Sequence, residues 1–268
     1  MTAVWERQGA LAGGVGDTDI ETIVETFNIA TLWRYEAIVR LGLTGDSLAA
    51  AASPSPVIPQ LLDFLVRNVA AAPGGTVLDV GAGLAGFAET IRRSLGRPVV
   101  AFDASRGTCS GARRLFPDVL AARAHPAALP VGTETIAAAI SCGLLSVLGD
   151  PDQLMVEARR VTKPAGRFVV IDLASATSSA ERVGSSIYLP AERILTSLVE
   201  SGFDVIDEAV GLTSLSDWAL ADDEIARDVA RRRRGESEFA HWLDDRRRLE
   251  RVMSSDRVVM VAFAATPR

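Results

Sequence analysis

The chain has 268 residues, of which 48% are hydrophobic, 23% charged and 6% aromatic, and its formal net charge is −6 at pH 7. This length suits one large α/β domain, and the apolar content excludes wholesale disorder. The acidic balance lacks the basic footprint of nucleic-acid-binding proteins, and two cysteines and two histidines are too few for a disulfide framework or a multi-histidine metal centre.

The mean hydropathy of +0.21 is high, but no stretch reaches the roughly 18 uninterrupted apolar residues that a membrane-spanning helix needs. The first eight residues are charged where a secretory signal would turn apolar. We therefore expect a cytoplasmic protein with no membrane contact, no metal, and a monomeric or homodimeric state.

Residues 1–16 are rich in glycine and read as a mobile lead-in. Apolar residues at helical spacing then predict one helix over 20–32, capped by Asp17 or Thr18, and a second over 33–43. The segment 52–59 ends this region, because its prolines fix φ and remove backbone donors. Residues 1–58 are expected to form a helical lid segment.

From Pro59 onward, apolar runs alternate with helical patterns. Helices are predicted over 59–72, 87–95, 152–161 and 191–201, with another after residue 102 that ends at Arg113. Strands are predicted over 76–80, 98–102, 119–123, 135–141, 167–172 and 203–209. Short apolar strands that alternate with helices indicate parallel βαβ units with helices on both faces of the sheet. We expect residues 59–211 to form this α/β core.

The tail departs from this rhythm. Residues 212–255 are charged and helical, which suggests a small cap inserted before a last strand at 256–268 that completes the core. The run Arg231–Arg234 has two interpretations: contact with a nucleic acid or acidic substrate, or exposed ion pairs with nearby carboxylates.

The segment Val77-Leu-Asp-Val-Gly-Ala-Gly-Leu-Ala-Gly86 carries the most chemical information. A strand leads into glycines and then a helix, so the backbone can approach a ligand at the helix N-terminus. Asp103 ends the next strand, where its two oxygens suit the two hydroxyls of a ribose. Asp79 would repel a pyrophosphate and favours a cationic nucleoside, or else it only fixes the turn through backbone bonds.

Three segments resemble the class I S-adenosylmethionine-dependent methyltransferases, in their small-molecule branch: Leu78–Gly83, Val100–Ser105, and Pro151–Ile171 with its Lys-Pro-Ala-Gly turn. The resemblance covers about residues 61–209, and it implies a Rossmann-like, seven-stranded, mostly parallel sheet with an antiparallel last strand. It also implies S-adenosylmethionine as cofactor and S-adenosylhomocysteine as product. The cofactor-binding residues it implies are Asp79, Gly81, Ala82, Gly83, Gly86, Asp103, Ala104, Ser105, His125, Pro126, Ser141 and Cys142.

Two departures from the family pattern concern the cofactor and the chemistry. His125 stands near the place of an aspartate that meets the adenine amino group, where it either accepts one hydrogen bond or begins a turn before Pro126. The histidines that many relatives carry after the fourth strand are missing from Ser141–Leu148. Cys142 is expected near the cofactor, where packing of a small residue explains it better than nucleophilic catalysis.

No general base is identified, and His241 is the one candidate catalytic residue. Trp33, Tyr35, Leu145, His241 and Trp242 are candidate substrate-binding residues. Trp33 and Tyr35 form either an aromatic wall over the cofactor or ordinary helix packing. His241 and Trp242 serve as base and platform, or lie on a solvated helix among Asp and Glu residues.

The sequence thus predicts methyl transfer to a small organic molecule, which proximity and orientation can largely drive. The arginine- and alanine-rich composition suggests a natural-product intermediate as substrate. Three alternatives stay open: a repurposed fold acting as a cyclase or lyase, an NAD(P)-dependent reductase using Gly81-x-Gly83-x-x-Gly86, and a non-catalytic partner subunit.

Overall fold

The computed structural model describes residues 19–53, 59–184, 186–211 and 215–268, without the side chains of residues 19–28, 59 and 215–221. In chain order its elements are α1 (Asp19–Leu41), α2 (Gly45–Ala51), α3 (Pro59–Ala70), β1 (Val77–Val80), α4 (Gly86–Leu95), β2 (Val99–Asp103), α5 (Arg106–Leu115), β3 (Leu120–Arg123), β4 (Ile136–Cys142), α6 (Leu145–Leu148), α7 (Asp152–Val161), β5 (Thr162–Ser175), β6 (Glu181–Val183), β7 (Ser186–Tyr188), α8 (Ala191–Glu200), β8 (Phe203–Gly211), α9 (Leu215–Arg233), α10 (Phe239–Met253) and β9 (Val258–Pro267).

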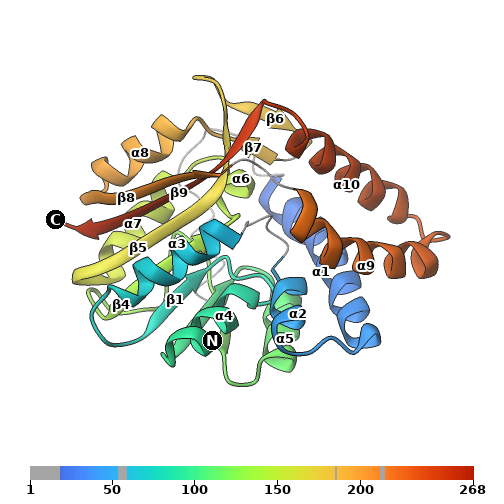
Figure 1. Ribbon diagram of the computed structural model, residues 1–268, viewed down its shortest axis with the longest axis horizontal. Coiled ribbons are helices and arrows are strands. Elements are labelled where there is room, and N and C mark those ends of the chain that lie inside the picture. Colours follow the sequence, from blue (N-terminus) through green and yellow to red (C-terminus); the bar gives the residue numbers. More distant parts are fainter. Residues whose placement is uncertain (1–18, 54–58, 185, 212–214) are drawn as a thin grey trace.

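Seven strands of the described ranges form one twisted sheet in the order β3-β2-β1-β4-β5-β9-β8 (Figure 1). The first five strands in this order, from β3 at the edge to β5, pair in parallel. The strand β9 lies between β5 and β8 and is antiparallel to both. Every residue of β1 and β4 is buried, because helices cover both faces of a parallel sheet. The predicted mostly parallel α/β sheet with an antiparallel last strand is confirmed.

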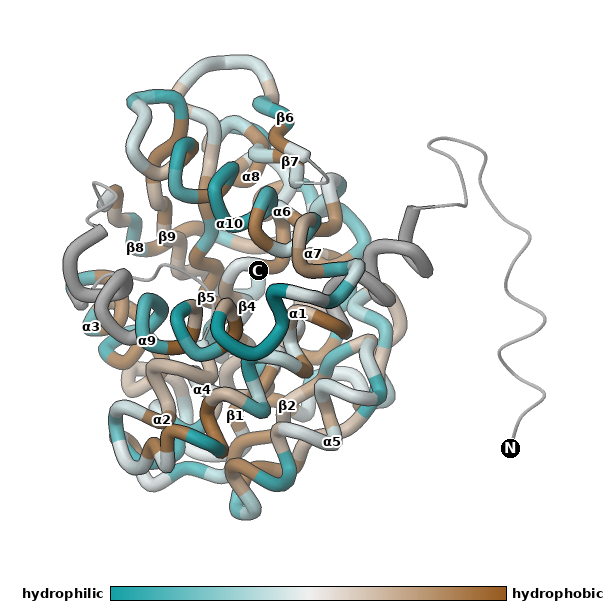
Figure 2. Tube along the Cα trace, turned by 90° about the vertical axis from the view of Figure 1, so that its right-hand side faces the viewer, coloured by the Kyte–Doolittle hydropathy of each residue, from teal (hydrophilic) through white to brown (hydrophobic). Residues whose placement is uncertain are grey.

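Helices cover the two faces in separate groups. On one face Leu65 of α3, Ile91 of α4 and Ala112 of α5 belong to one hydrophobic cluster. On the other face Leu154 of α7 and Ile194 of α8 belong to a second cluster. The apolar colour in Figure 2 follows the strands, while α9 and α10 carry much of the hydrophilic colour. Burial of the strands therefore accounts for the high mean hydropathy.

The strand order reverses beside β1, since the chain runs outward from β1 to β3 and then returns to β4. Figure 1 shows α1, α9 and α10 together at the end of the sheet opposite the C-terminus. Because β9 is antiparallel and leads to that terminus, these helices lie beyond the carboxyl ends of the parallel strands. In open α/β sheets a ligand binds at this end, next to the reversal of strand order.

Buried ion pairs join the cap helices to α1. The carboxylate of Asp222, on α9, is only 3% exposed and pairs with Arg34 of α1 and Arg246 of α10. Asp228 pairs with Arg40 of α1 at 2.7 Å. The two contacts to α1 each join residues 188 positions apart in the sequence.

Several predicted boundaries were wrong. The helices expected over 20–32 and 33–43 are one continuous helix, α1, since neither proline nor glycine interrupts residues 19–41. The helix α2 was not predicted. The strand β5 was expected from residue 167 but begins at Thr162, because Thr162 forms an irregular pair with Ile136 ahead of the regular register. The two-stranded pair β6 and β7 was also not predicted, since each of its strands has only three residues. The lead-in 1–16 and the caps Asp17 and Thr18 lie outside the described residues.

Among the residues that the structure describes, no helix is both long enough and apolar enough to span a bilayer.

Candidate functional site

The glycine loop joins β1 to α4 at the point where the strand order reverses. The carbonyl of Phe102, on β2, accepts hydrogen bonds from Gly81 N at 2.8 Å and Ala82 N at 3.0 Å. Gly81 and Gly83 have φ of 74° and 55°, and a Cβ at Gly83 would meet no atom within 4 Å. The loop therefore turns through the left-handed region and leaves open space above Gly83.

Ala85, two positions after Gly83, also has a positive φ, of 66°. A side chain in this region is strained by roughly 1–2 kcal/mol. Gly86 is required for a different reason, because a Cβ there would lie 2.2 Å from the carbonyl oxygen of Ala49 on α2. The short helix α2 thus presses directly on the start of α4.

Asp103 holds the loop from the end of β2. One carboxylate oxygen accepts Gly83 N at 3.0 Å, and the other accepts Ser105 N at 2.8 Å. Burial raises the pKa of Asp103, although these two amides act in the opposite direction. Each carboxylate oxygen has a second lone pair, so both can still accept a hydroxyl. The geometry is compatible with the predicted ribose contact, and it adds a structural role that the sequence did not reveal.

Asp79 is fully enclosed within β1. It is 1% exposed, and its Oδ2 has no hydrogen-bond partner among the described residues. Burial, and next the negative charge of Asp103, raise the pKa of Asp79 to about 7, against a weaker opposing effect of the Ala88 amide. An unpaired buried carboxylate is costly unless a ligand completes it. This orphaned oxygen fits a cationic group and does not fit a phosphate.

The segment after β2 is fixed by side chain to backbone contacts. The hydroxyl of Ser105 caps α5 by accepting Thr108 N at 3.2 Å. Arg123, at the end of β3, donates its Nε to the carbonyl of Ala104 at 2.8 Å. Ala104 and Ser105 thus lie at the carboxyl edge, in a well-defined backbone conformation.

His125 begins a turn after β3, followed by the buried Pro126. Its Nδ1 accepts the amide of Ala127 at 3.1 Å, and His125 also forms an isolated bridge with Ala128. Burial lowers the pKa of His125, so the ring is neutral near pH 7. Because Nδ1 is an acceptor, the proton lies on Nε2, which can only donate. His125 thus begins a turn before Pro126, and in this tautomer its second ring nitrogen is a donor toward a ligand.

The ends of β4 and β5 bring together residues from separate parts of the sequence. Cys142 is buried, and burial raises the pKa of its thiol well above the usual range, with further increases from Asp79 and Asp172. A neutral thiol is a poor nucleophile, which agrees with a packing role. Ser141 is 1% exposed, and its hydroxyl lacks a partner among the described residues. Leu145, at the start of α6, is buried in the second hydrophobic cluster.

The predicted aromatic residues lie mainly inside the protein. Trp33 is 3% exposed and packs edge-on against Trp242 with ring centroids 6.2 Å apart, and Trp242 stacks on Phe239. The guanidinium of Arg233 lies 5.7 Å from the centroid of Trp33. Tyr35 is half-buried and lies near Gly111 of α5. Helix packing therefore accounts for Trp33, and Trp242 faces the interior, contrary to the expectation of a solvated helix.

His241 is exposed on α10, whereas its neighbour Trp242 packs inward. It contacts neither the glycine loop nor Asp79 in any described interaction. His241 therefore does not lie as a base beside the candidate cofactor site.

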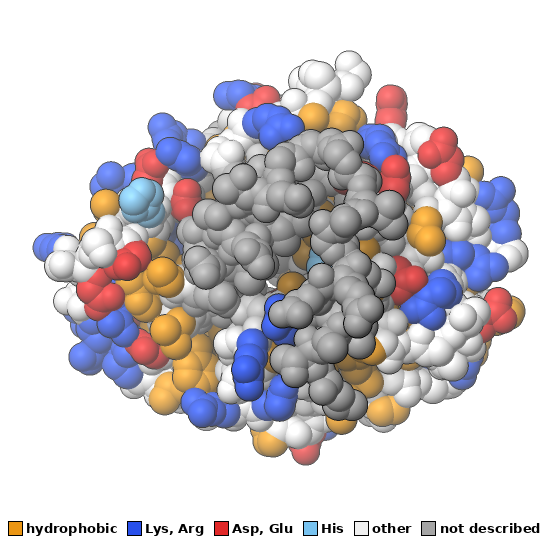
Figure 3. Space-filling model, turned by 180° about the vertical axis from the view of Figure 1, so that it is seen from behind, with side chains coloured by type: hydrophobic (Ala, Val, Ile, Leu, Met, Phe, Trp, Pro, Cys, Tyr) orange, Lys and Arg blue, Asp and Glu red, His pale blue; other side chains and the backbone are white. Residues whose placement is uncertain are grey.

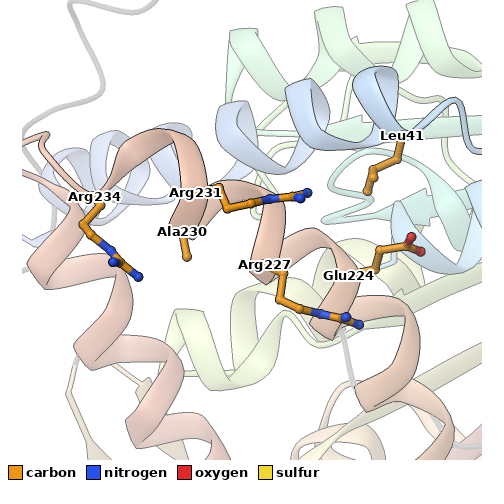
Figure 4. Close-up of a pocket in the computed structure, with 6 residues that line it drawn as sticks. All are labelled: Leu41, Glu224, Arg227, Ala230, Arg231 and Arg234. Atoms are coloured by element: carbon orange, nitrogen blue, oxygen red, sulfur yellow. The ribbon is translucent and has the colours of Figure 1, made fainter.

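The arginine run is involved mostly in ion pairs. Arg231 and Arg232 each lie 3.5 Å from Asp228, and Arg233 contacts Glu236 and Glu36. Among the carboxylates that follow the run in the sequence, Glu236 is the one with a described ion pair to it. A surface groove of about 400 Å³ along α9 and the end of α1 is lined by Leu41, Glu224, Arg227, Ala230, Arg231 and Arg234 (Figure 4). No predicted cofactor residue lines it, and acidic and basic side chains are also interspersed on the face in Figure 3.

Sequence reasoning missed Asp172 and Tyr188. Asp172 is 1% exposed in β5, and burial raises its pKa to about 6. Tyr188 of β7 is 3% exposed, and burial and the nearby Asp172 raise the pKa of its hydroxyl. An acidic residue inside an otherwise apolar strand, Arg167-Phe-Val-Val-Ile-Asp172, was the available signal.

Comparison with known proteins agrees with the geometry. Residues 78–170 match the family described as "Methyltransferase domain". A demethylmenaquinone methyltransferase of Renibacterium salmoninarum is 36% identical over 127 residues, which cover 47% of this chain and only about half (53%) of that protein. A second protein so named, from Clavibacter sepedonicus, is 31% identical over 169 residues, covering 58% of this chain and 67% of the relative.

Among solved structures, the fold is similar to that of the [4+2]-cyclase SpnF. The TM-score is 0.65 at 21% identity, and the match covers 78% of this chain and 80% of that one. Motifs, sheet topology and sequence relatives all agree. The chain belongs to the class I S-adenosylmethionine-dependent methyltransferase family.

Proposed function

We propose that this protein binds S-adenosylmethionine at the carboxyl ends of β1 and β2 and transfers its methyl group to a small organic acceptor. The observation that carries the proposal is the unpaired, buried Oδ2 of Asp79 beside a glycine loop with open space above Gly83. A carboxylate in that position is suited to the ammonium group of the cofactor. It is unsuited to the pyrophosphate of NAD(P), which needs free donors at the helix N-terminus.

Other residues have defined roles in this proposal. Asp103 accepts the ribose hydroxyls while it holds Gly83 and Ser105 in place. Gly81, Ala82, Gly86 and Ala104 shape the backbone around the cofactor, and Ser141 and Cys142 line the end of β4. His125 donates Nε2–H to an acceptor on the adenine ring, with Pro126 fixing the turn.

The bound cofactor supplies an electrophilic methyl group on a sulfonium that becomes neutral on transfer. The protein mainly positions the acceptor in line with that group and excludes water, because such a displacement gains most from proximity and orientation. No imidazole is placed as a base, since His125 serves the turn and His241 is exposed. We propose the space beyond β4 and β5, near Leu145 and Tyr188, for the acceptor.

The acceptor itself is proposed only by class. The relatives act on demethylmenaquinone by name, but their similarity covers 58% of this chain at most, so their acceptor is not carried over. The composition, with one lysine against 27 arginines, supports a natural-product intermediate. The test is release of S-adenosylhomocysteine during incubation with panels of phenols, amines and carboxylic acids; tight cofactor binding with no methyl transfer to any acceptor would contradict it.

A second candidate is a cyclase or lyase that binds the cofactor without consuming it. The use of His125 by its turn and the exposure of His241 favour it, because they leave no imidazole assigned to deprotonate an alcohol or phenol. Conversion of an acceptor with no loss of S-adenosylmethionine would select this candidate over methyl transfer.

A further inference from the structure

The buried carboxylate of Asp172 joins the loop after β4 to β5. Its Oδ2 accepts the amide of Leu145 at 2.7 Å, its Oδ1 accepts the amide of Leu173 at 2.8 Å, and Ser146 adds further hydrogen bonds. Leu145 is the first residue of α6, and Leu144 before it has no side-chain cap to offer. Asp172, on β5, therefore accepts a hydrogen bond from a backbone amide at the start of α6 that has no partner within the helix.

The segment held in this way packs directly against the glycine loop. A Cβ at Gly81 would lie 2.8 Å from a methyl group of Leu144, so the Leu144 side chain occupies the space above the first loop glycine. The amide of Gly143 donates to the carbonyl of Ile171 at 2.9 Å, which fixes the other end of the segment to β5. The position of Leu144 is thus set from both sides.

The same segment also supports β7. A Cβ at Gly149, the residue that ends α6, would lie 2.7 Å from the Cδ1 of Ile187. One four-residue helix consequently touches the strand pair β6–β7 on one side, while the residue before it covers the glycine loop on the other.

We propose that Asp172 is a positioning residue for cofactor binding, which holds Leu144 over Gly81 by anchoring the start of α6. In this role it acts through the segment 143–149, because its oxygens accept the backbone amides of Leu145 and Leu173. The inference rests on the proposed function, because it concerns the same glycine loop.

The Asp172→Asn variant tests the proposal, because one amide N–H would then face a side-chain NH₂ instead of an oxygen. Hydrogen exchange of residues 143–149 should accelerate in the protein without ligand. The dissociation constant of S-adenosylmethionine, measured by calorimetry, should rise about tenfold, the typical effect of losing one hydrogen bond to a charged group. The melting temperature at pH 8 should not fall, since the variant removes a buried charge.

A matched control is Asp152→Asn at the start of α7. Asp152 also makes two side-chain contacts, to Arg193 at 2.7 Å and Ser197 at 2.6 Å, but they connect α7 to α8 away from the loop. This control should leave the dissociation constant unchanged. Leu144→Ala should weaken binding like Asp172→Asn, and the double variant should be little worse than either one, because both act through the same segment.

Three results would overturn the proposal: unchanged exchange at 143–149 in Asp172→Asn, an unchanged dissociation constant, or fully additive effects with Leu144→Ala. If the wild-type protein binds no S-adenosylmethionine, the proposed function fails, and the exchange measurement still decides whether Asp172 anchors this segment.

Discussion

Asp79 creates a conflict between stability and cofactor binding that can be measured. In the folded protein its pKa is about 7, whereas the unperturbed value is 3.8. Because the folded pKa lies above the unfolded one, the contribution of Asp79 to stability is present at low pH and is lost as the pH rises through about 7. The full shift corresponds to about 4 kcal/mol, since one pKa unit is about 1.4 kcal/mol.

Asp79→Asn removes this effect and keeps an oxygen that can accept the Ala88 amide. Between pH 5 and pH 8 the free energy of unfolding of the variant, relative to wild type, should increase by about 3 kcal/mol. Urea denaturation at the two pH values measures this difference. Asp46→Asn is the matched control, because that carboxylate is 98% exposed and its substitution should change stability equally at both pH values.

Cofactor binding should respond in the opposite direction. From pH 5 to pH 7 the wild-type affinity for S-adenosylmethionine should rise by up to about tenfold per pH unit, because Asp79 must lose its proton to pair with the ammonium. In Asp79→Asn the affinity should be low and nearly independent of pH in this range. A variant that is less stable than wild type at pH 8, or that binds the cofactor as well, would refute the reasoning.

Three further predictions concern the loop, the turn and the cap. Gly83 and Gly42 have φ of 55° and 62°, and a new methyl group would meet no atom at either position, so Gly83→Ala and Gly42→Ala should each lower stability by roughly 1–2 kcal/mol. Calorimetry should show that only Gly83→Ala abolishes cofactor binding. Equal binding by both variants would contradict the site. His125→Asn keeps an acceptor for the turn amide, so its melting temperature should hold while the dissociation constant rises about tenfold, and an unchanged constant would show that Nε2 is not used. Asp222→Ala removes one partner from two partly buried guanidiniums, although Arg246 keeps Asp223 and Glu250 and Arg34 keeps the Ala51 carbonyl, and should cost about 1.5–3 kcal/mol in urea denaturation. Burial opposes ionisation of Asp222, but these guanidiniums outweigh burial and lower its pKa, so the stabilisation is lost only as the pH falls below the usual carboxyl range. A decrease in the free energy of unfolding of less than about 1 kcal/mol would show that other contacts hold α9.

Local pattern was sufficient for the parallel core. The runs Val77–Val80 and Ile136–Cys142 are apolar except for Asp79 and Ser141, which is the pattern expected of strands buried on both faces. Pattern failed where neighbours decide the structure. The strands β6 and β7 have only three residues each and pack against α10 and α6.

The candidate site shows the same division. Asp79 and Asp103 were predicted because a glycine loop and a strand end are visible in sequence order. The role of Asp172 was not, since its partner Leu145 lies 27 positions earlier and the contact exists only once β4 and β5 are adjacent. Trp242 was misjudged because the acidic residues around it suggested solvent, whereas Trp33, far away in the sequence, covers it.

The central claim is that the glycine loop with Asp79 and Asp103 holds a cationic nucleoside and not a dinucleotide. Isothermal titration of the wild-type protein at pH 8 with S-adenosylmethionine, and separately with NADPH and NADH, tests it most directly. We predict saturable binding of S-adenosylmethionine at one site per chain and no heat from either nicotinamide nucleotide. Binding of NADPH or NADH with none of S-adenosylmethionine would contradict the account.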